Sequence, residues 1–396
     1  MWGTGGHLET SPTWAEASPS RGRRQNAEVP CWIAAHWIGS IYVDQSFNHS
    51  GGSISVEGTS AAKNGGAILV RQDFIHTGGS ISVEGSSSAE KGGAIDVEKS
   101  FTQSGGSLAV TNSSAKLYGG AIRVSNFNHT GGSISVEGSS AKYGGAIYVR
   151  KNFAQSGGSI AVMNSSAEST GGAIYVAEDF TQSGGSLAVT NSSAQEYGGA
   201  IRVSNFNHTG GSISVEGSSA KHGGAIDVEK SFTQSGGSLA VTNSLAQEYG
   251  GAIFVREDFH HTGGSISIEG SSAEYGGAID VEKSFTQSGG SLAVVNSLAQ
   301  VSGGGLYVVD DMVFTNALVT FSQCHAPHQG GGIRTTGNVS LTNASLSFEL
   351  ATTDGRGAAL LGDSLEQVGG RMTVYNSYSS GASGDVIDVA AWAIDG

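Results

Sequence analysis

The tetrapeptide Gly-Gly-Ala-Ile recurs along this 396-residue chain, and its regular spacing constrains the fold more than any other feature. Consecutive copies lie 25 to 27 residues apart, degenerate copies keep the same step toward the C-terminus, and one further copy fits upstream at Ile38. Self-similarity at a fixed period of this length indicates a repeat architecture. The exact copies begin at Gly65, Gly92, Gly119, Gly144, Gly171, Gly198, Gly223, Gly250 and Gly276.

Each repeat has the pattern of two short strands and a third segment that carries a phenylalanine. In Gly-Gly-Ala-Ile-x-Val, and in the Gly-Gly-Ser-(Ile/Leu)-x-Val that follows half a repeat later, the aliphatic residues stand two positions apart. That is the period of a β-strand, so both aliphatic side chains point to the same side. The residue between them varies freely, which indicates an outward position. Glycine pairs suit the corners because glycine tolerates a positive φ and close backbone approach.

A single repeat of this kind buries too few large apolar groups to fold alone, whereas stacked repeats also gain backbone ladders between turns. Leucine-rich and helical repeats are disfavoured because their patterns are absent. Glycine is abundant, at 63 residues, but proline occurs only 4 times and there is no Gly-X-Y period, which excludes collagen. The sequence therefore predicts an all-β fold, a right-handed parallel β-helix (solenoid) of about 13 turns with roughly 27 residues per turn.

The regularity of the repeats divides the chain into three parts. We expect residues 1–37 to form a non-repeat N-terminal segment or cap, residues 38–302 to form the regular β-helix, and residues 303–396 to form degenerate repeats and the C-terminal end. All five tryptophans lie outside the regular array. Solenoids need atypical ends that stop the terminal strands from pairing with other chains.

The net charge and the hydropathy of the chain limit its partners. The formal net charge is −14, and no basic patch is visible, which argues against nucleic acid as a ligand. No run approaches 18 consecutive apolar residues, so we expect no transmembrane helix. The N-terminus lacks the pattern of a signal peptide, and no cofactor motif is present.

The repeated Gly-Gly-Ala-Ile with a regularly spaced phenylalanine resembles the repeats of chlamydial polymorphic outer membrane proteins. Those repeats carry GGAI and FxxN motifs on a right-handed β-helix passenger. Here the second motif reads FxxS or FxxT, as at Phe101–Ser104 and Phe127–Thr130, and the chain has no counterpart of the family's C-terminal membrane barrel. The resemblance implies an adhesin-like passenger at the cell surface or outside the cell.

The outward positions of the first strand are the candidate ligand-binding residues. If successive repeats stack in register, Tyr148 lies next to Tyr175, where two rings could bind the flat face of a sugar or stack for structural reasons alone. Arg123 and Arg202 flank them, each beside an aspartate of a neighbouring repeat, which predicts stabilising pairs of opposite charge. We name Arg123, Tyr148, Tyr175 and Arg202 as candidate ligand-binding residues.

Two further groups of polar residues were weighed for metal binding or catalysis. The histidines of the NHS and NHT turns and of the equivalent positions are interpreted as surface-turn residues, in most cases several turns apart and too distant to share a metal; they are His49, His76, His129, His208 and His261. The degenerate repeats contain Asp310, Asp311, Cys324, His325 and His328, but no third catalytic group or oxyanion site is recognisable. We therefore predict neither catalytic residues nor a metal site.

These observations favour a non-enzymatic scaffold over an enzyme. The regular array offers a long surface without a unique polar cluster, as expected of an adhesin-like surface or extracellular protein that binds proteins or glycans. The alternative is a polysaccharide-active β-helix lyase or hydrolase with its site in the degenerate C-terminal turns.

Overall fold

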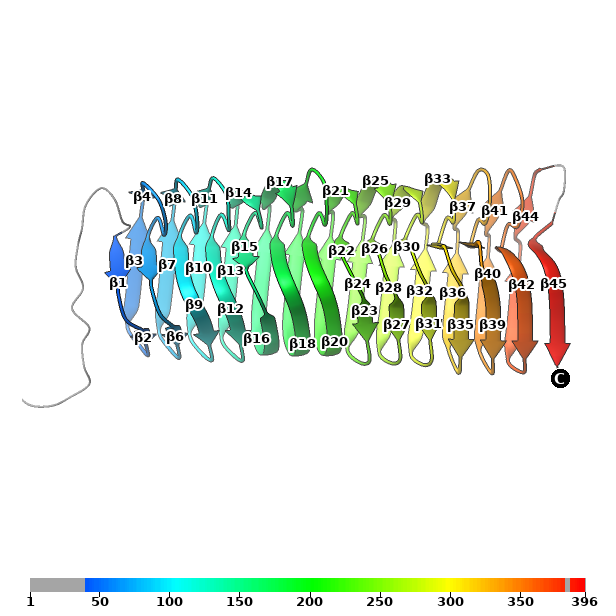
Figure 1. The fold of residues 1–396 in the computed structure, drawn as a ribbon, viewed down its shortest axis with the longest axis horizontal. Coiled ribbons are helices and arrows are strands. Elements are labelled where there is room, and N and C mark those ends of the chain that lie inside the picture. The colour runs from blue at the N-terminus through cyan, green and yellow to red at the C-terminus, as the bar shows by residue number, and fades with distance from the viewer. Residues whose placement is uncertain (1–39, 382–384, 396) are drawn as a thin grey trace, which may run out of the picture. The chain divides into compact units, whose positions relative to one another are not determined.

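The computed structural model describes residues 40–381 and 385–395, and these residues form a solenoid of parallel β-strands without any helix (Figure 1). Strands of successive turns pair in parallel at a spacing of about 27 residues, as in Ile41 with Ile68. The prediction of an all-β parallel β-helix of about 13 turns is thereby confirmed. The predicted N-terminal cap, residues 1–37, lies outside the described residues.

The Gly-Gly-Ala-Ile motif or a degenerate copy of it leads into the first strand of each turn, and fourteen such strands stack along the described part of the solenoid. Several of them continue through the next corner as one long strand. They are β1 (Ile41–Val43), β5 (Ile68–Val70), β9 (Ile95–Gln103), β12 (Ile122–His129), β15 (Ile147–Val149), β18 (Ile174–Thr190), β20 (Ile201–Glu216), β22 (Ile226–Val228), β26 (Ile253–Val255), β30 (Ile279–Val281), β34 (Leu306–Val308), β38 (Ile333–Thr335), β42 (Leu360–Val368) and β45 (Ile387–Asp395).

Where the first strand has ended, the phenylalanine opens the second strand of a turn, and in the degenerate turns Met312 or Asn338 takes this place. These strands are β2 (Phe47–His49), β6 (Phe74–His76), β16 (Phe153–Met163), β23 (Phe232–Gln234), β27 (Phe259–His261), β31 (Phe285–Gln287), β35 (Met312–Thr315) and β39 (Asn338–Thr342). In the regular turns the Gly-Gly-Ser motif opens the third strand, and β16, β18 and β20 run into this position without a break. The separate third strands are β3 (Ser53–Glu57), β7 (Ser80–Glu84), β10 (Ser107–Thr111), β13 (Ser133–Glu137), β24 (Ser238–Thr242), β28 (Ser265–Glu269), β32 (Ser291–Val295), β36 (Leu318–Ser322), β40 (Ser345–Glu349) and β43 (Arg371–Tyr375).

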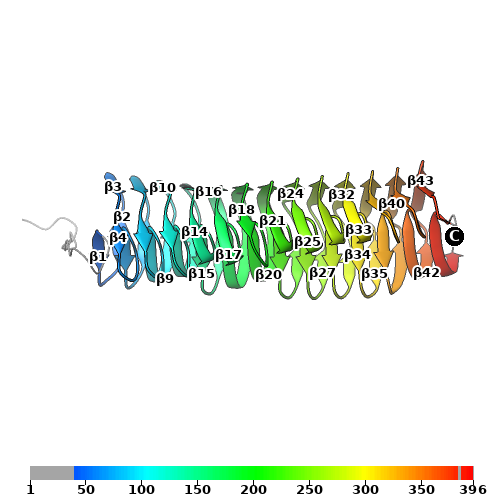
Figure 2. The same ribbon diagram turned by 90° about the horizontal axis from the view of Figure 1, so that it is seen from above.

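A short fourth strand closes each turn before the next glycine pair, and these strands form a separate 13-stranded sheet. The other three rows are joined through the long strands into one 32-stranded sheet. Figure 2 shows the stacked turns from above. The fourth strands are β4 (Ser60–Ala61), β8 (Ser87–Ser88), β11 (Ser114–Ala115), β14 (Ser140–Tyr143), β17 (Ser166–Thr170), β19 (Ser193–Ala194), β21 (Ser219–His222), β25 (Leu245–Tyr249), β29 (Ser272–Tyr275), β33 (Leu298–Ser302), β37 (His325–Ala326), β41 (Thr352–Thr353) and β44 (Tyr378–Ser379).

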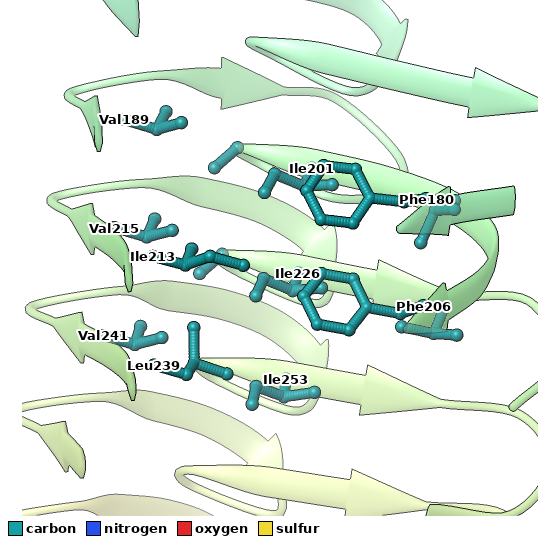
Figure 3. Close-up of a cluster of buried hydrophobic side chains, with 14 of the residues drawn as sticks. Phe180, Val189, Ile201, Phe206, Ile213, Val215, Ile226, Leu239, Val241 and Ile253 are labelled. Atoms are coloured by element: carbon teal, nitrogen blue, oxygen red, sulfur yellow. The ribbon is translucent and has the colours of Figure 1, made fainter. Parts of the chain in front are cut away.

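The interior of the solenoid is filled by equivalent side chains of successive turns. Phenylalanines from Phe47 to Phe285 form one stack with 4.3 to 5.3 Å between neighbouring ring centroids. The isoleucines and valines of the first and third strands pack against this stack, as Figure 3 shows for Phe180, Phe206 and Ile213. The inward direction predicted from the two-residue period is therefore correct.

The corners explain why particular small residues recur. A Cβ on Gly66 would overlap the carbonyl oxygen of Gly93 in the next turn, so the second glycine of the motif must lack a side chain. After the third strand, the chain turns through one residue with a positive φ, which is glycine in some repeats, such as Gly138, and asparagine in others, such as Asn164. Asparagine is the residue that best replaces glycine in this left-handed conformation.

The interpretation of the histidines as surface-turn residues is wrong. Each histidine follows a phenylalanine by two positions, so the strand turns both side chains to the same inner side. His76, His129, His208 and His261 have no exposed surface, and His49 is 7% exposed. In five other turns the same slot holds a buried glutamine, at Gln103, Gln155, Gln182, Gln234 and Gln287. The glutamine Nε2 donates to backbone carbonyls; that of Gln155, for example, donates to Ser186 at 2.9 Å.

Candidate functional site

The side chains of two rows meet on the outside of the solenoid at the corner made by each glycine pair. One row is the residue before the pair, and the other is the residue between the isoleucine and valine of the first strand. Although both rows point outward, Asp96, Arg123, Asp227 and Asp280 are each less than a tenth exposed. Facing side chains of the two rows therefore shield one another from solvent.

Aromatic residues dominate this corner, which we call the aromatic corner. Tyr118 and Tyr143 stack with 5.5 Å between ring centroids, and Tyr118 reaches across to Tyr148 of the next turn at 4.6 Å. Further along, His222 stacks between Tyr197 and Tyr249 at 5.0 and 5.3 Å. The aromatic corner comprises Tyr118, Tyr143, Tyr148, Tyr175, Tyr197, His222, Tyr249, Phe254, Tyr275 and Tyr307.

The four candidate residues lie on four successive turns of this corner. The register places Arg123 beside Tyr148, Tyr148 beside Tyr175, and Tyr175 beside Arg202. The rings of Tyr148 and Tyr175 are 5.2 Å apart and nearly parallel, at 5°. Burial, with the neighbouring tyrosines Tyr175 and Tyr118, raises the pKa of Tyr148 to about 12, so its hydroxyl stays neutral at physiological pH.

Both arginines of the candidate set are held by aspartates of the adjoining turn. Arg123 donates to Asp96 at 3.1 Å, and burial raises the pKa of the Asp96 carboxyl to about 6 although Arg123 opposes the shift. Arg202 forms an ion pair with Asp227 on the other side. Arg256 also binds Asp227, with nitrogen–oxygen distances of 2.8 and 3.2 Å. The predicted pairs of opposite charge therefore form, and they occupy the two guanidinium groups.

Sequence reasoning missed the row that precedes the glycine pairs. It named Tyr148 and Tyr175 but not the residues that face them, Tyr118 and Tyr143. The signal was present, since an aromatic residue recurs immediately before the motif at Tyr118, Tyr143, Tyr197, Tyr249 and Tyr275. What the period does not reveal is that the chain bends at the glycines so that these side chains meet the first strand.

The polar residues of the degenerate turns do not gather into one site. Asp311 accepts hydrogen bonds from the backbone and side chain of Asn338, at 2.8 and 3.0 Å, between β34 and β35. Cys324 lies two strands later inside the core, where burial raises the pKa of its thiol to about 12. His325 is engaged with Thr352 at 2.8 Å. A buried thiol of this kind is a poor nucleophile.

Residues 40–381 and 385–395 offer neither a metal-binding cluster nor a membrane-spanning helix. Within that part of the chain, no cluster of three or more histidine, cysteine or carboxylate side chains could hold a metal ion. The same residues include no helix long and apolar enough to cross a membrane.

Comparison with known proteins leaves the aromatic corner without a counterpart. No protein-family model, no curated protein and no solved structure matches the chain. The fold and the geometry of its outer surface are therefore the basis for any statement about function.

Proposed function

We propose that this chain is a non-enzymatic, adhesin-like scaffold at the cell surface or outside the cell, which binds a glycan or protein ligand along the aromatic corner. The observation that carries the proposal is the row of half-buried tyrosines on the outside of four successive turns, centred on Tyr148 and Tyr175. The likeness of the repeats to chlamydial polymorphic outer membrane proteins supports the surface location.

Tyrosine is well suited to such a surface. Its ring offers a flat apolar face, its hydroxyl forms hydrogen bonds, and few torsions are lost when it binds. Because the strands of a parallel stack lie about 4.8 Å apart, the rings repeat at a fixed interval along the axis, and an extended ligand can contact several turns. The aspartates hold Arg123 and Arg202 in place at both ends of the tyrosine pair.

The alternative is a polysaccharide lyase or hydrolase in the degenerate C-terminal turns. It would require Asp310, Asp311, Cys324, His325 or His328 to act together. The burial of Cys324 and the engagement of Asp311 with Asn338 argue against that arrangement.

The test is a binding panel of immobilised polysaccharides and cell-surface proteins, scored for bound chain and for newly released sugar ends. We expect binding without release, and loss of that binding in the Tyr148→Ala, Tyr175→Ala variant. The matched control removes two tyrosines outside the corner, Tyr375 and Tyr378, which are each 60% exposed. Equal loss in both variants, or released ends that disappear with Asp311→Ala, would overturn the proposal.

A further inference from the structure

One carboxylate of the aromatic corner lacks the partner that its equivalents have. Asp280 stands between Ile279 and Val281 in β30, at the position that Asp96 and Asp227 occupy in β9 and β22. It is 2% exposed, and its Oδ2 atom has no hydrogen-bond partner. Its register neighbours are Phe254 and Tyr307, so neither adjoining turn supplies an arginine there.

The equivalent aspartates show what this position binds in the same chain. Asp96 pairs with Arg123 of the following turn, and Asp227 pairs with Arg202 of the preceding one. Arg256, which lies on the turn before Asp280, is directed to Asp227 and donates to both of its carboxylate oxygens. At two positions of three, therefore, the outward aspartate of the first strand holds a guanidinium group.

Aromatic rings complete the guanidinium site at Asp227. The guanidinium carbon of Arg256 lies 4.7 Å from the ring centroid of Tyr197 and 4.9 Å from that of Phe254. A cation over a ring face is attracted by the ring's electron density, most strongly where water is excluded. Carboxylate and aromatic rings thus act together on the same cation.

The surroundings of Asp280 repeat this arrangement around a hollow. A pocket of about 340 Å³ is lined by Asp280, Glu282, Val309 and three tyrosines, Tyr249, Tyr275 and Tyr307. Glu282 is exposed at its rim, whereas Asp280 is almost fully buried. Burial, with the nearby Glu282 carboxylate, raises the pKa of Asp280 well above its usual value. The pocket therefore combines aromatic side chains with a buried carboxyl group, as the Asp227 site does, but no arginine or lysine is among its lining residues.

We propose that this pocket binds the guanidinium group of an arginine presented by a protein partner. The inference rests on the proposed function, because the pocket is part of the aromatic corner, and it narrows the ligand there to a protein with an exposed arginine. A guanidinium fits better than a neutral sugar because its positive charge would pair with the carboxylates of Asp280 and Glu282. Its planar face also suits a site walled by tyrosine rings.

The experiment titrates the full chain with N-acetyl-arginine amide at low salt and follows binding by ligand-detected NMR or calorimetry. The matched probe is N-acetyl-citrulline amide, which has nearly the same shape without the charge, and N-acetyl-lysine amide tests an ammonium group. We expect the arginine probe to bind and both others to bind at least about tenfold more weakly, because citrulline lacks the charge and the lysine ammonium lacks the planar, forked donors of a guanidinium. Equal binding of the citrulline probe, or of the lysine probe, would overturn the assignment.

Two variants place the binding in this pocket. Asp280→Asn keeps the shape and removes the charge, and it should weaken the arginine probe roughly tenfold or more. Tyr307→Arg supplies an arginine from the following turn, as Arg123 does for Asp96, and should block the probe while the protein stays folded. The control Tyr378→Arg adds the same charge outside the corner and should leave binding unchanged. Unaltered binding in both pocket variants would refute the proposal.

The outcome is separable from that of the proposed function. If the arginine probe fails to bind while Tyr148→Ala, Tyr175→Ala still abolishes binding in the panel, the pocket assignment is wrong and the scaffold proposal stands. If the probe binds at Asp280 but panel binding does not depend on the tyrosine pair, the pocket is confirmed and the wider binding face is refuted.

Discussion

The buried histidines predict that acid weakens this fold, and His129 allows the effect to be calculated. His129 has no exposed surface, its Nε2 atom has no partner, and its Nδ1 atom lies 3.5 Å from the amide nitrogen of Gln155. Burial lowers the pKa of this imidazole from 6.5 to about 4. The imidazole therefore stays neutral in the folded chain at a pH where it takes up a proton in the unfolded chain.

The direction of the effect follows from these two pKa values. Above pH 6.5 both states are neutral at this position and stability is unaffected. Between pH 6.5 and about 4 only the unfolded state gains the proton, so stability falls as the pH falls. At pH 5 the loss from His129 alone amounts to about 2 kcal/mol.

The perturbation that isolates this loss is His129→Gln, because glutamine already fills the same slot at Gln103 and Gln155. Urea unfolding followed by circular dichroism would give the free energy of unfolding of both proteins at pH 7.5 and pH 5.0. The variant should lose about 2 kcal/mol less than the parent between the two pH values. Other titrating groups, including Asp96, are common to both proteins and cancel in this difference.

The reciprocal variant sharpens the test. Gln155→His adds an imidazole to a slot of the same interior row and should increase the loss on acidification. If all three proteins lose the same free energy between pH 7.5 and pH 5.0, within about 0.5 kcal/mol, the buried row does not control acid stability. That result would refute the reasoning from burial.

Three further predictions concern the core, a corner and the unpaired carboxylate. Phe180→Ala should cost about 3–5 kcal/mol in urea unfolding, because it opens a cavity in the middle of the phenylalanine stack. Gly93→Ala should cost about 1–3 kcal/mol since its Cβ overlaps the carbonyl oxygen of Gly120, whereas Gly51→Ala, with no atom within 4 Å of its Cβ, should stay within about 0.5 kcal/mol in the same assay. Asp280→Asn should raise the free energy of unfolding at pH 8 by about 1–3 kcal/mol, because a raised pKa means that the folded state resists ionisation. This gain should disappear as the pH falls toward 3.8, where both states of the parent are protonated, and a gain independent of pH would contradict the assignment.

The architecture was predictable because the same motif recurs so many times at the same spacing that the repeat cannot be accidental. The two-residue spacing of isoleucine and valine determines which side chains point inward, and the fixed period determines which residues become neighbours, such as Tyr148 and Tyr175. The same period should have placed His129 inside, since it stands two positions after Phe127. Histidine was predicted at the surface because it is polar, whereas strand geometry turns the His129 side chain inward.

The aromatic corner was only partly predictable, for a different reason. A period tells which residues are stacked along the axis, as with Arg123 and Tyr148, but not which rows face each other across a bend. The contact of Tyr118 with Tyr148 depends on the direction the chain takes at the glycine pair. That direction follows from backbone packing, in which each second glycine lies against the carbonyl of the next turn.

Asp280 lacks an arginine partner because repeats of identical sequence stand between different neighbouring repeats. The block Gly-Gly-Ala-Ile-Asp-Val-Glu-Lys-Ser-Phe occurs three times with the same residues, and it carries Asp96, Asp227 and Asp280. The three carboxylates differ only in their neighbours. Each outward side chain lies beside the equivalent side chains of the turns before and after it, and these residues are not part of the copied block. Copying one repeat therefore moves the aspartate without its arginine. Where the neighbours are Phe254 and Tyr307, the same block leaves a buried carboxyl group without an arginine, and a ligand can supply the guanidinium that Arg123 supplies to Asp96.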